Sequence, residues 1–301
     1  MSTDLSAVGG TRPFYGTALV ASAALFWSSA GLLSRLVATD SWTTMFWRSL
    51  TSAIFLFAAL WFTRRREMWR ALRTLFGSGI TITLSQAIAS ISFILALMNT
   101  SVATALIIMA TAPLFAALLA RLFLGEPIRP KTAVATVVAI VGIGVMVSEN
   151  LAPGTLFGNA MSLLSAISFA ALIVTMRRHH EVELVPAVSL AAFLTALVSL
   201  PIAGRDVAVG PRDLGLLTLF GMGEQGLGLL LFTYGVRHIP SVEVALIGLL
   251  ESILAPLWVW IFIGEAPGPL TLAGAAIVVA ALLVNILADR RPSAPVMPPL
   301  Q

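Results

Sequence analysis

NTSVATALIIMATAPLFAALLARLFLGE, residues 99–126, is repeated in pattern at residues 237–265 as RHIPSVEVALIGLLESILAPLWVWIFIGE. Ser101 matches Ser241, an offset of 140 residues, and the same Gly-Glu pair ends both copies at an offset of 139. An odd number of membrane spans between the copies inverts the second one relative to the first. Inverted repeats in an apolar chain are typical of alternating-access carriers, whose substrate site lies between the repeats.

The composition is that of a membrane protein. Of the 301 residues, 58% are hydrophobic and 11% are charged, whereas a soluble domain has about 45–50% apolar and about 25% charged residues. The absence of cysteine excludes disulfides, thiolate catalysis and cysteine-based metal sites. The net charge of +4 is concentrated in short loops rather than on a soluble face, so we expect no nucleic-acid partner.

The apolar runs predict an all-α membrane protein with ten transmembrane helices in two inverted five-helix repeats. Each run is long enough to cross the bilayer, which takes about 20 residues, and a helix satisfies its own backbone groups in lipid. The predicted spans are residues 15–37, 42–62, 75–98, 100–124, 131–148, 155–176, 186–203, 213–236, 240–263 and 268–288.

These spans group into two predicted domains. The first five-helix repeat occupies residues 14–148 and the second, inverted repeat residues 155–288. The terminal segments, residues 1–13 and 289–301, are expected to be disordered tails, since the second is rich in proline and cannot pack. Because two halves in one chain already form the pseudo-symmetric pair, a monomer is the simplest functional unit.

The distribution of basic residues predicts the orientation. With the amino terminus inside, the inner loops hold fourteen Lys or Arg residues and the outer loops hold three, Arg35, Arg205 and Arg212. An excess of basic residues marks the cytoplasmic side. We therefore expect a multi-pass protein of a bacterial inner membrane with both termini in the cytoplasm.

Several local marks resemble a known family. The two halves look like EamA repeats of the drug/metabolite transporter superfamily over about residues 14–288. One departure is that many second repeats carry Glu-Pro where this chain has Glu251-Ser252, with its proline later. The matching marks are Phe26-Trp27, Trp47-Arg48-Ser49, Pro113, Gly125-Glu126 and Gly264-Glu265.

The resemblance implies ten helices in two inverted halves and export of small metabolites from the cytoplasm. The superfamily includes amino acid exporters of the YddG type, and also carriers of drugs, sugars and nucleotide sugars. No motif in this chain assigns it to one of these groups.

Polar side chains within the spans are the candidate substrate-binding residues, because polar groups in hydrocarbon are costly and are functional by default. Glu224 and Gln225 lie in the middle of span eight, in a run with four glycines that allows close approach of a ligand or another backbone. Subtracting the 140-residue offset from position 225 gives Ser85 in span three, and Gln86 follows it. Both repeats therefore place polar side chains near the middle of a span. Met109 is predicted to supply a pliable apolar wall. The alternative is that the polar groups form interhelical hydrogen bonds.

A second set of residues is predicted to couple or gate transport. Glu251 lies in the middle of span nine, where it carries a proton, neutralises a cationic group or pairs structurally with Arg48. Glu243 is shallow in the same span and fits a cytoplasmic gate or a solvated carboxylate. Arg48 either snorkels outward or pairs with an acidic group in the bundle. Pro113 and Pro256, placed mid-helix, are hinges or static kinks.

The sequence does not favour an enzyme. It contains no P-loop, no H-E-x-x-H and no G-x-S-x-G motif, and we expect no cofactor and no bound metal. A non-transporting scaffold or sensor would need larger exposed loops, and an intramembrane enzyme a nucleophile or a metal pair at depth.

The function predicted from the sequence is secondary transport by alternating access. The favoured substrate is a small, neutral or aromatic metabolite such as an amino acid, held in a mostly apolar central cavity lined by spans three, four, eight and nine. The alternative is a proton-coupled multidrug exporter of lipophilic cations, with Glu224 or Glu251 as the counter-charge.

Overall fold

A computed structural model describes residues 11–75, 79–149, 151–179, 183–204, 207–235, 238–239 and 241–287. For residues 11–14, 64–75, 177, 241–243, 245, 246 and 249 only the backbone is described. The two predicted disordered tails lie outside the described residues, apart from the first residues of the first helix.

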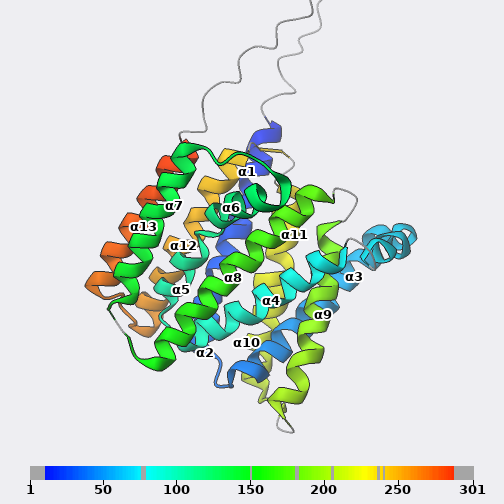
Figure 1. Ribbon diagram of the computed structural model, residues 1–301. Coiled ribbons are helices and arrows are strands. Elements are labelled where there is room, and N and C mark those ends of the chain that lie inside the picture. The colour runs from blue at the N-terminus through cyan, green and yellow to red at the C-terminus, as the bar shows by residue number, and fades with distance from the viewer. Residues whose placement is uncertain are drawn as a thin grey trace, which may run out of the picture.

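The described part of the chain is helical and contains no strand (Figure 1). Its elements are α1 (Thr11–Ser28), α2 (Ala30–Leu36), α3 (Ser41–Leu75), α4 (Gly79–Asn99), α5 (Val102–Met109), α6 (Ala112–Leu124), α7 (Pro130–Val147), α8 (Pro153–Arg178), α9 (Leu184–Ala203), α10 (Pro211–Thr218), η1 (Leu219–Leu227), α11 (Gly228–Gly235), α12 (Ser241–Ile263) and α13 (Pro269–Leu287).

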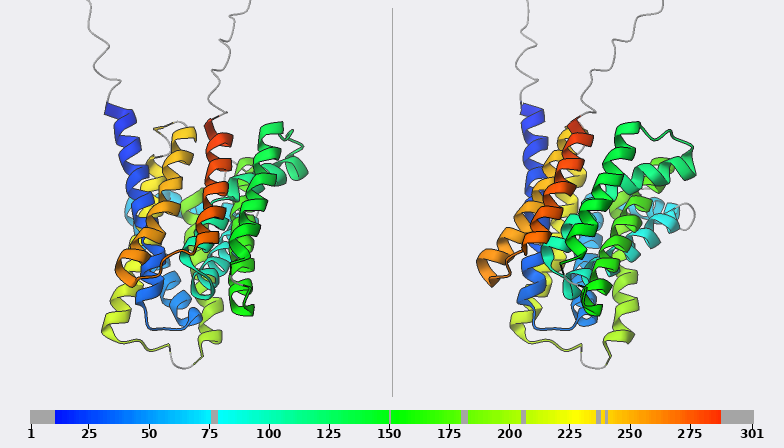
Figure 2. Two further views of the ribbon diagram at one scale, coloured as in Figure 1. Left: turned by 90° about the vertical axis from the view of Figure 1, so that its left-hand side faces the viewer. Right: turned by 60° about the vertical axis from the view of Figure 1, so that its left-hand side comes forward.

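The helices confirm the all-helical, multi-span prediction. In the described residues, nine helical stretches are long and apolar enough to cross a membrane. α12 accounts for the remaining predicted span, with Leu250–Ile263 as its described apolar part. Figure 2 shows the start of α1 and the end of α13 at one end of the bundle, and the end of α2 at the other. We call the second end the Arg35 face and the first the Glu126 face.

Three predicted spans are broken rather than continuous. Span one divides at Ser29, where the hydroxyls of Ser28 and Ser29 bond to the carbonyls of Leu25 and Phe26 at 2.7 and 2.6 Å. Such local bonds compete with the helical ladder. Span four divides into α5 and α6, and span eight contains the π-helical segment η1. The break in span four lies beside Pro113, where a hinge or kink was predicted, but the break at Ser29 and the π-helical segment of span eight were not predicted.

Pro113, predicted as a hinge or kink, lies at the break in the middle of the span Val102–Leu124. Pro113 stands in the first turn of α6, directly after the break at Thr111. Proline is tolerated there because the first backbone N–H groups of a helix have no intrahelical partner. Pro256, by contrast, lies inside α12 as expected. The loop expected after span two is also helical, since α3 continues to Leu75.

A two-fold relation between the halves is visible in the packing of α7 on α13. A Cβ atom at Gly142 would meet the carbonyl of Gly274 and the side chain of Val278. In return, a Cβ at Gly274 would meet the carbonyl of Gly142 and the side chain of Met146. An offset of 132 residues converts one set of contacts into the other, because 142 becomes 274 and 146 becomes 278. The contact is thus self-complementary, as across a two-fold axis.

The same two-fold relation connects the first helices of the two halves, α1 and α8, each at a different face of the bundle. A Cβ at Gly16 in α1 would meet His238 and Ile239, in the turn before α12. A Cβ at Gly158 in α8 would meet Asn99 and Thr100, in the turn before α5. Each first helix therefore crosses the turn between the third and fourth spans of the other half. The two halves interleave instead of standing side by side.

We expect the glycines between α7 and α13 to be essential for stability. Gly142→Ala and Gly274→Ala place a methyl group against backbone, and overpacking of this kind costs about 1–3 kcal/mol. Gly144→Ala is the matched control, since a Cβ there would meet nothing within 4 Å. Thermal unfolding in detergent should show lower melting temperatures for the first two variants and no loss for the third. Equal melting temperatures for all three would contradict the packing argument.

Candidate functional site

The centre of the bundle contains a buried ion pair. Arg48 lies in the second turn of α3 and Glu224 in η1, and their side chains meet with 2.8 Å between Nη2 and Oε2. Arg48 is 3% exposed and Glu224 is 5% exposed. Of the two alternatives for Arg48, the structure shows the inward pairing. Its partner is Glu224, not Glu251.

Two further groups hold the guanidinium in place. Nη1 of Arg48 donates to the Ser90 hydroxyl of α4 at 3.2 Å. The guanidinium carbon lies 4.7 Å from the centre of the Phe220 ring, a fully buried side chain of η1. A cation over an aromatic face gains from the negative charge of the ring face, and more so without water. Neither Ser90 nor Phe220 was predicted as a site residue.

The glycines around Glu224 bring α3 against η1. A Cβ at Gly221 would meet the carbonyl of Arg48 and the hydroxyl of Thr51, and one at Gly226 would meet the ring of Phe55. The close approach predicted for this glycine run is therefore made by another helix. π-helical turns are rare and occur frequently at functional sites.

Two polar atoms at this centre have no hydrogen-bond partner in the described part of the chain. They are Nε of Arg48, a donor, and Oε1 of Gln225, an acceptor. Leaving a buried polar group unpaired costs about 1–3 kcal/mol. The centre thus has unused capacity for one donated and one accepted hydrogen bond.

The other predicted binding residues lie on two other helices, α4 and α5. Ser85 and Gln86 are half-buried in α4, and Ser90, one turn beyond Gln86, is the α4 side chain that reaches the ion pair. Met109, half-buried at the end of α5, accepts a contact of 3.7 Å from the Ser165 hydroxyl.

The predicted coupling residues lie mainly on α12. Glu251 is half-buried there. Pro256 follows it within the helix. The side chain of Glu243 lies outside the described residues.

A polar cavity of about 670 Å³ opens at the Arg35 face. It differs from the apolar central cavity predicted for spans three, four, eight and nine, because it lies at the ends of the helices and many of its lining side chains are polar. Its lining residues are Arg35, Met98, Asn99, Thr100, Ser101, Thr104, Met146, Glu149, Thr155, Asn159, Glu265, Ala266, Pro267, Gly268 and Thr271.

Glu149 in this wall caps the start of α13. Its carboxylate accepts from the backbone N–H groups of Thr271 at 2.6 Å and Leu270 at 3.3 Å. The bonds from Thr271, side chain first and then backbone, hold the pKa of Glu149 below its ordinary value. Because the folded pKa is lowered, this cap stabilises the fold at neutral pH and is lost as the pH falls through that pKa.

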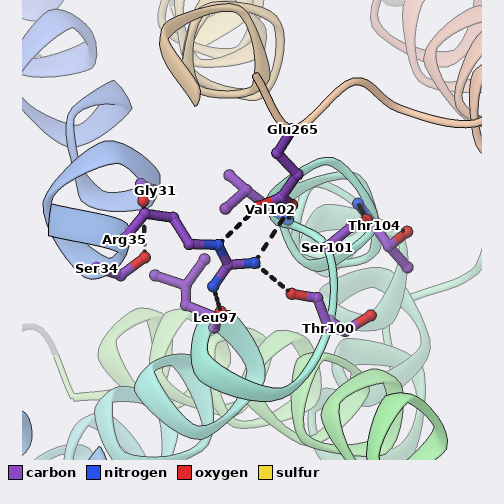
Figure 3. Close-up of polar contacts among 9 residues, drawn as sticks. All are labelled: Gly31, Ser34, Arg35, Leu97, Thr100, Ser101, Val102, Thr104 and Glu265. Carbon is purple, nitrogen blue, oxygen red and sulfur yellow. Dashed lines mark hydrogen bonds and ion pairs between the residues drawn. The ribbon is translucent and has the colours of Figure 1, made fainter. Parts of the chain in front are cut away.

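A second ion pair crosses between the halves beside the cavity (Figure 3). Nε of Arg35 donates to Oε2 of Glu265 at 2.7 Å, and Nη2 donates to Oε1 at 3.3 Å. Arg35 also donates to the carbonyls of Leu97 and Thr100, the latter at 2.8 Å. Oε1 of Glu265 accepts from the N–H of Val102, the first residue of α5.

Gly125 and Gly264 end α6 and α12 in the left-handed conformation, with φ of 70° and 81°. Glycine adopts positive φ without steric cost. In the sequence, the Gly-Glu pairs stand out only as the end of each repeat copy and as marks of the family. Neither mark gave a reason to select Glu265 as half of an ion pair.

Comparison with known proteins identifies the class. The model of the EamA-like transporter family matches residues 14–148 and 156–287. The chain therefore belongs to this family of the drug/metabolite transporter superfamily. It is a multi-pass membrane transporter and not an enzyme, which confirms the family resemblance seen in the sequence.

Two relatives are named for different solutes and for opposite directions of transport. An S-adenosylmethionine uptake transporter of Rickettsia felis is 30% identical over 63% of this chain and 65% of its own length. The pseudopaline exporter CntI of Pseudomonas aeruginosa is 28% identical over 65% of this chain and 70% of its own. The chain thus spans slightly less than two thirds of the Rickettsia relative.

Two broader matches cover nearly the whole chain. An uncharacterised transporter of Archaeoglobus fulgidus is 26% identical over 90% of this chain and 96% of its own length. A solved crystal structure superimposes with a TM-score of 0.66 at 21% identity, over 92% of this chain and 98% of that one. At this identity the likeness shows the fold alone.

We expect the two central charges to depend on each other for stability. Arg48→Leu leaves the Glu224 carboxylate buried without its partner, which costs about 3–5 kcal/mol. Arg48→Leu combined with Glu224→Leu removes both charges and should recover most of this loss. The measurement is the melting temperature of the single and the double variant in detergent. If the double variant is no more stable than Arg48→Leu, the loss of stability does not come from the unpaired Glu224 carboxylate.

Proposed function

We propose that this transporter exports small zwitterionic metabolites, neutral or aromatic amino acids above all, from the cytoplasm by alternating access. The observation that supports this is the buried centre: a cation, an anion, one unpartnered donor and one unpartnered acceptor. Groups of both signs side by side suit a solute that carries both a carboxylate and an ammonium group.

In this proposal the substrate supplies the missing hydrogen bonds. Its carboxylate accepts from Nε of Arg48, and its ammonium donates to Oε1 of Gln225 and to the Glu224 carboxylate. A site built to hydrogen-bond such groups rejects analogues that lack them, because its own buried groups would then stay unpaired. Ser85, Gln86 and Met109 are proposed to form the nearby wall that selects the side chain.

We propose the orientation from the positive-inside rule. The Glu126 face carries Arg121, Arg129, Lys131 and Arg178, whereas the Arg35 face carries Arg35 and Arg212 among the described residues. The Glu126 face is therefore proposed to be cytoplasmic, with both termini there. A monomer in the inner membrane is the proposed functional unit, since the chain contains both halves of the two-fold pair.

Direction is part of the proposal. The relatives include a protein named for uptake and one named for export, so both directions occur among similar chains. We favour export, as the family resemblance implies. Net efflux of a preloaded labelled amino acid from cells that express the protein measures this directly.

The alternative is proton-coupled export of lipophilic cations. The half-buried Glu251 of α12 favours it, because a carboxylate within a membrane span can take up a proton and release it on binding a cation. In this reading Glu251 is the coupling residue, and Pro256 allows the half of α12 beyond it to move.

Counterflow in proteoliposomes tests the proposal. Vesicles are preloaded with unlabelled neutral, aromatic, basic or acidic amino acids in separate batches, and a labelled neutral amino acid is added outside. We expect accumulation only with neutral or aromatic preloads. Flat traces in every batch, together with uptake of a lipophilic cation driven by a pH gradient, would refute the proposal and support the alternative.

Glu224→Gln separates the two mechanisms further. Because the amide keeps a hydrogen-bonding oxygen but loses the charge, zwitterion counterflow should weaken by about tenfold, the effect of one lost charge-assisted bond, and cation export should disappear. Asp213→Asn is the matched control, a carboxylate removed near the start of the same broken span. It should leave counterflow unchanged.

A further inference from the structure

The cavity at the Arg35 face contains a buried amide with an unused donor. Asn159 of α8 lines this cavity and is 6% exposed. Its Oδ1 accepts from the hydroxyl of Thr100 at 2.7 Å, but its Nδ2 has no hydrogen-bond partner in the described part of the chain. Thr100 turns its carbonyl oxygen to Arg35 and its hydroxyl away from it (Figure 3). An unpaired buried donor is costly, so the cavity favours a ligand with a hydrogen-bond acceptor.

Packing of the helices does not explain the amide. α8 crosses the turn before α5 as α1 crosses the turn before α12, with a glycine at each crossing. The offsets of 142 and 140 residues that relate these segments take Asn159 to Thr17 and Thr100 to Pro240. The crossing at the Glu126 face is thus made without an asparagine, so the asparagine at the Arg35 face is not a requirement of the crossing.

The charged side chains of the cavity favour a cationic group. Among the described residues, the carboxylates of Glu149 and Glu265 and the guanidinium of Arg35 line it. The bonds from Thr271 hold the pKa of Glu149 below its ordinary value, so this carboxylate is ionised at neutral pH. A carboxylate has about four acceptor positions, and Glu265 uses three of them. The excess of negative charge attracts an ammonium group, and acceptor capacity remains to bind it.

The cavity is separate from the buried centre. Met98 at the cavity follows Ser90 at the centre by eight residues of α4, which is about 12 Å along a helix. A buried apolar cluster fills the space between them: it includes Phe220, which lies against Arg48, and Leu97, and Met98 packs against it. The ammonium and carboxylate groups of an amino acid are attached to one carbon atom. One molecule therefore cannot occupy both places.

We propose that the cavity at the Arg35 face is a second binding site, for solutes that carry an ammonium group beside a carbonyl or carboxylate oxygen. The ammonium group donates to the carboxylates of Glu149 and Glu265, and the oxygen accepts from Nδ2 of Asn159. In the proposed orientation this is the outer face, where an exported solute binds after it leaves the centre. This place in the transport path rests on the proposed function, whereas binding at the cavity does not.

The two sites differ in the blocked amino acids that they accept. The Asn159 amide is neutral and donates equally well to an ester carbonyl, so the methyl ester of an amino acid fits the cavity. An N-acetyl derivative lacks the ammonium group and carries a net negative charge, so the cavity rejects it. The centre, by contrast, selects for both charged groups. Because Glu149 and Glu265 are partly exposed, water screens their charges, and we expect the cavity to bind a free amino acid more weakly than the centre does.

Titration calorimetry with leucine methyl ester tests the proposal. The full-length protein is held in nanodiscs of phosphatidylcholine, and empty nanodiscs correct for ester that binds to lipid. Arg48→Leu combined with Glu224→Leu removes the charges of the centre only. We expect the ester to bind this double variant as tightly as the wild type, and N-acetyl-leucine to bind the double variant at least about tenfold more weakly than the ester. No ester binding to the double variant, or equal binding of the two compounds, would overturn the proposal.

Two substitutions in the wall locate the bound ester. Asn159→Leu removes the unpaired donor and should weaken ester binding by about tenfold. Glu149→Gln keeps an oxygen for the backbone N–H groups at the start of α13 but removes the charge, and should weaken it by about fivefold. Because Glu149→Gln preserves the cap, it tests the site even where Asn159→Leu does not fold.

Asn285→Leu is the matched control. Asn285 of α13 accepts from the hydroxyl of Thr132 at 2.9 Å, as Asn159 accepts from that of Thr100, but it lies near the end of α13 at the Glu126 face (Figure 2). Its loss should leave ester binding unchanged. Equal weakening by Asn285→Leu and Asn159→Leu, or unchanged affinity in Glu149→Gln, would contradict the second site.

The second site and the proposed function can fail separately. Ester binding that depends on Asn159 and Glu149, together with flat amino acid counterflow, would refute only the proposed function. Amino acid counterflow without ester binding to the double variant would refute only the second site.

Discussion

The buried pair of Arg48 and Glu224 is the interaction on which the rest of this structure depends. An arginine and a glutamate in hydrocarbon are each prohibitive alone and tolerable together. To meet, they require α3 and the π-helical turn of span eight to approach closely, and the glycines of that turn make the approach possible. A pair of this kind contributes little net stability compared with apolar packing, so its presence points to function.

The two-fold relation between the halves explains how such a centre can face both sides of a membrane. Identical relationships recur at the two faces, where Gly16 and Gly158 each receive the turn that precedes the fourth span of the other half. The axis passes between α7 and α13, where Gly142 and Gly274 make equivalent contacts. A fold built from two equivalent halves around one centre has the symmetry that the proposed alternating access requires.

Much of this could be predicted from the sequence, and the failures have physical causes. The ten spans follow from apolar runs, and Arg48 and Glu224 stand out because charges are rare in such runs. Their pairing could not be assigned, since the sequence named only Glu251 as a structural partner for Arg48 and the packing of α3 against η1 brings Glu224 to it instead. Ser90 and Phe220 resemble ordinary span residues, so nothing marked them. The π-helical turn and the breaks at Ser29 and Thr111 depend on tertiary packing and local hydroxyl bonds, which periodicity does not report.

Equilibrium binding to the purified protein tests the central claim most directly. Displacement of a bound labelled neutral amino acid is compared for three unlabelled competitors: the free amino acid, its methyl ester and its N-acetyl derivative. Recognition by Arg48, Glu224 and Gln225 predicts that the free amino acid competes and that each blocked form competes at least about tenfold more weakly, because each leaves a buried polar group unpaired. Equal competition by all three compounds would show that the central pair does not recognise the charged groups of the substrate.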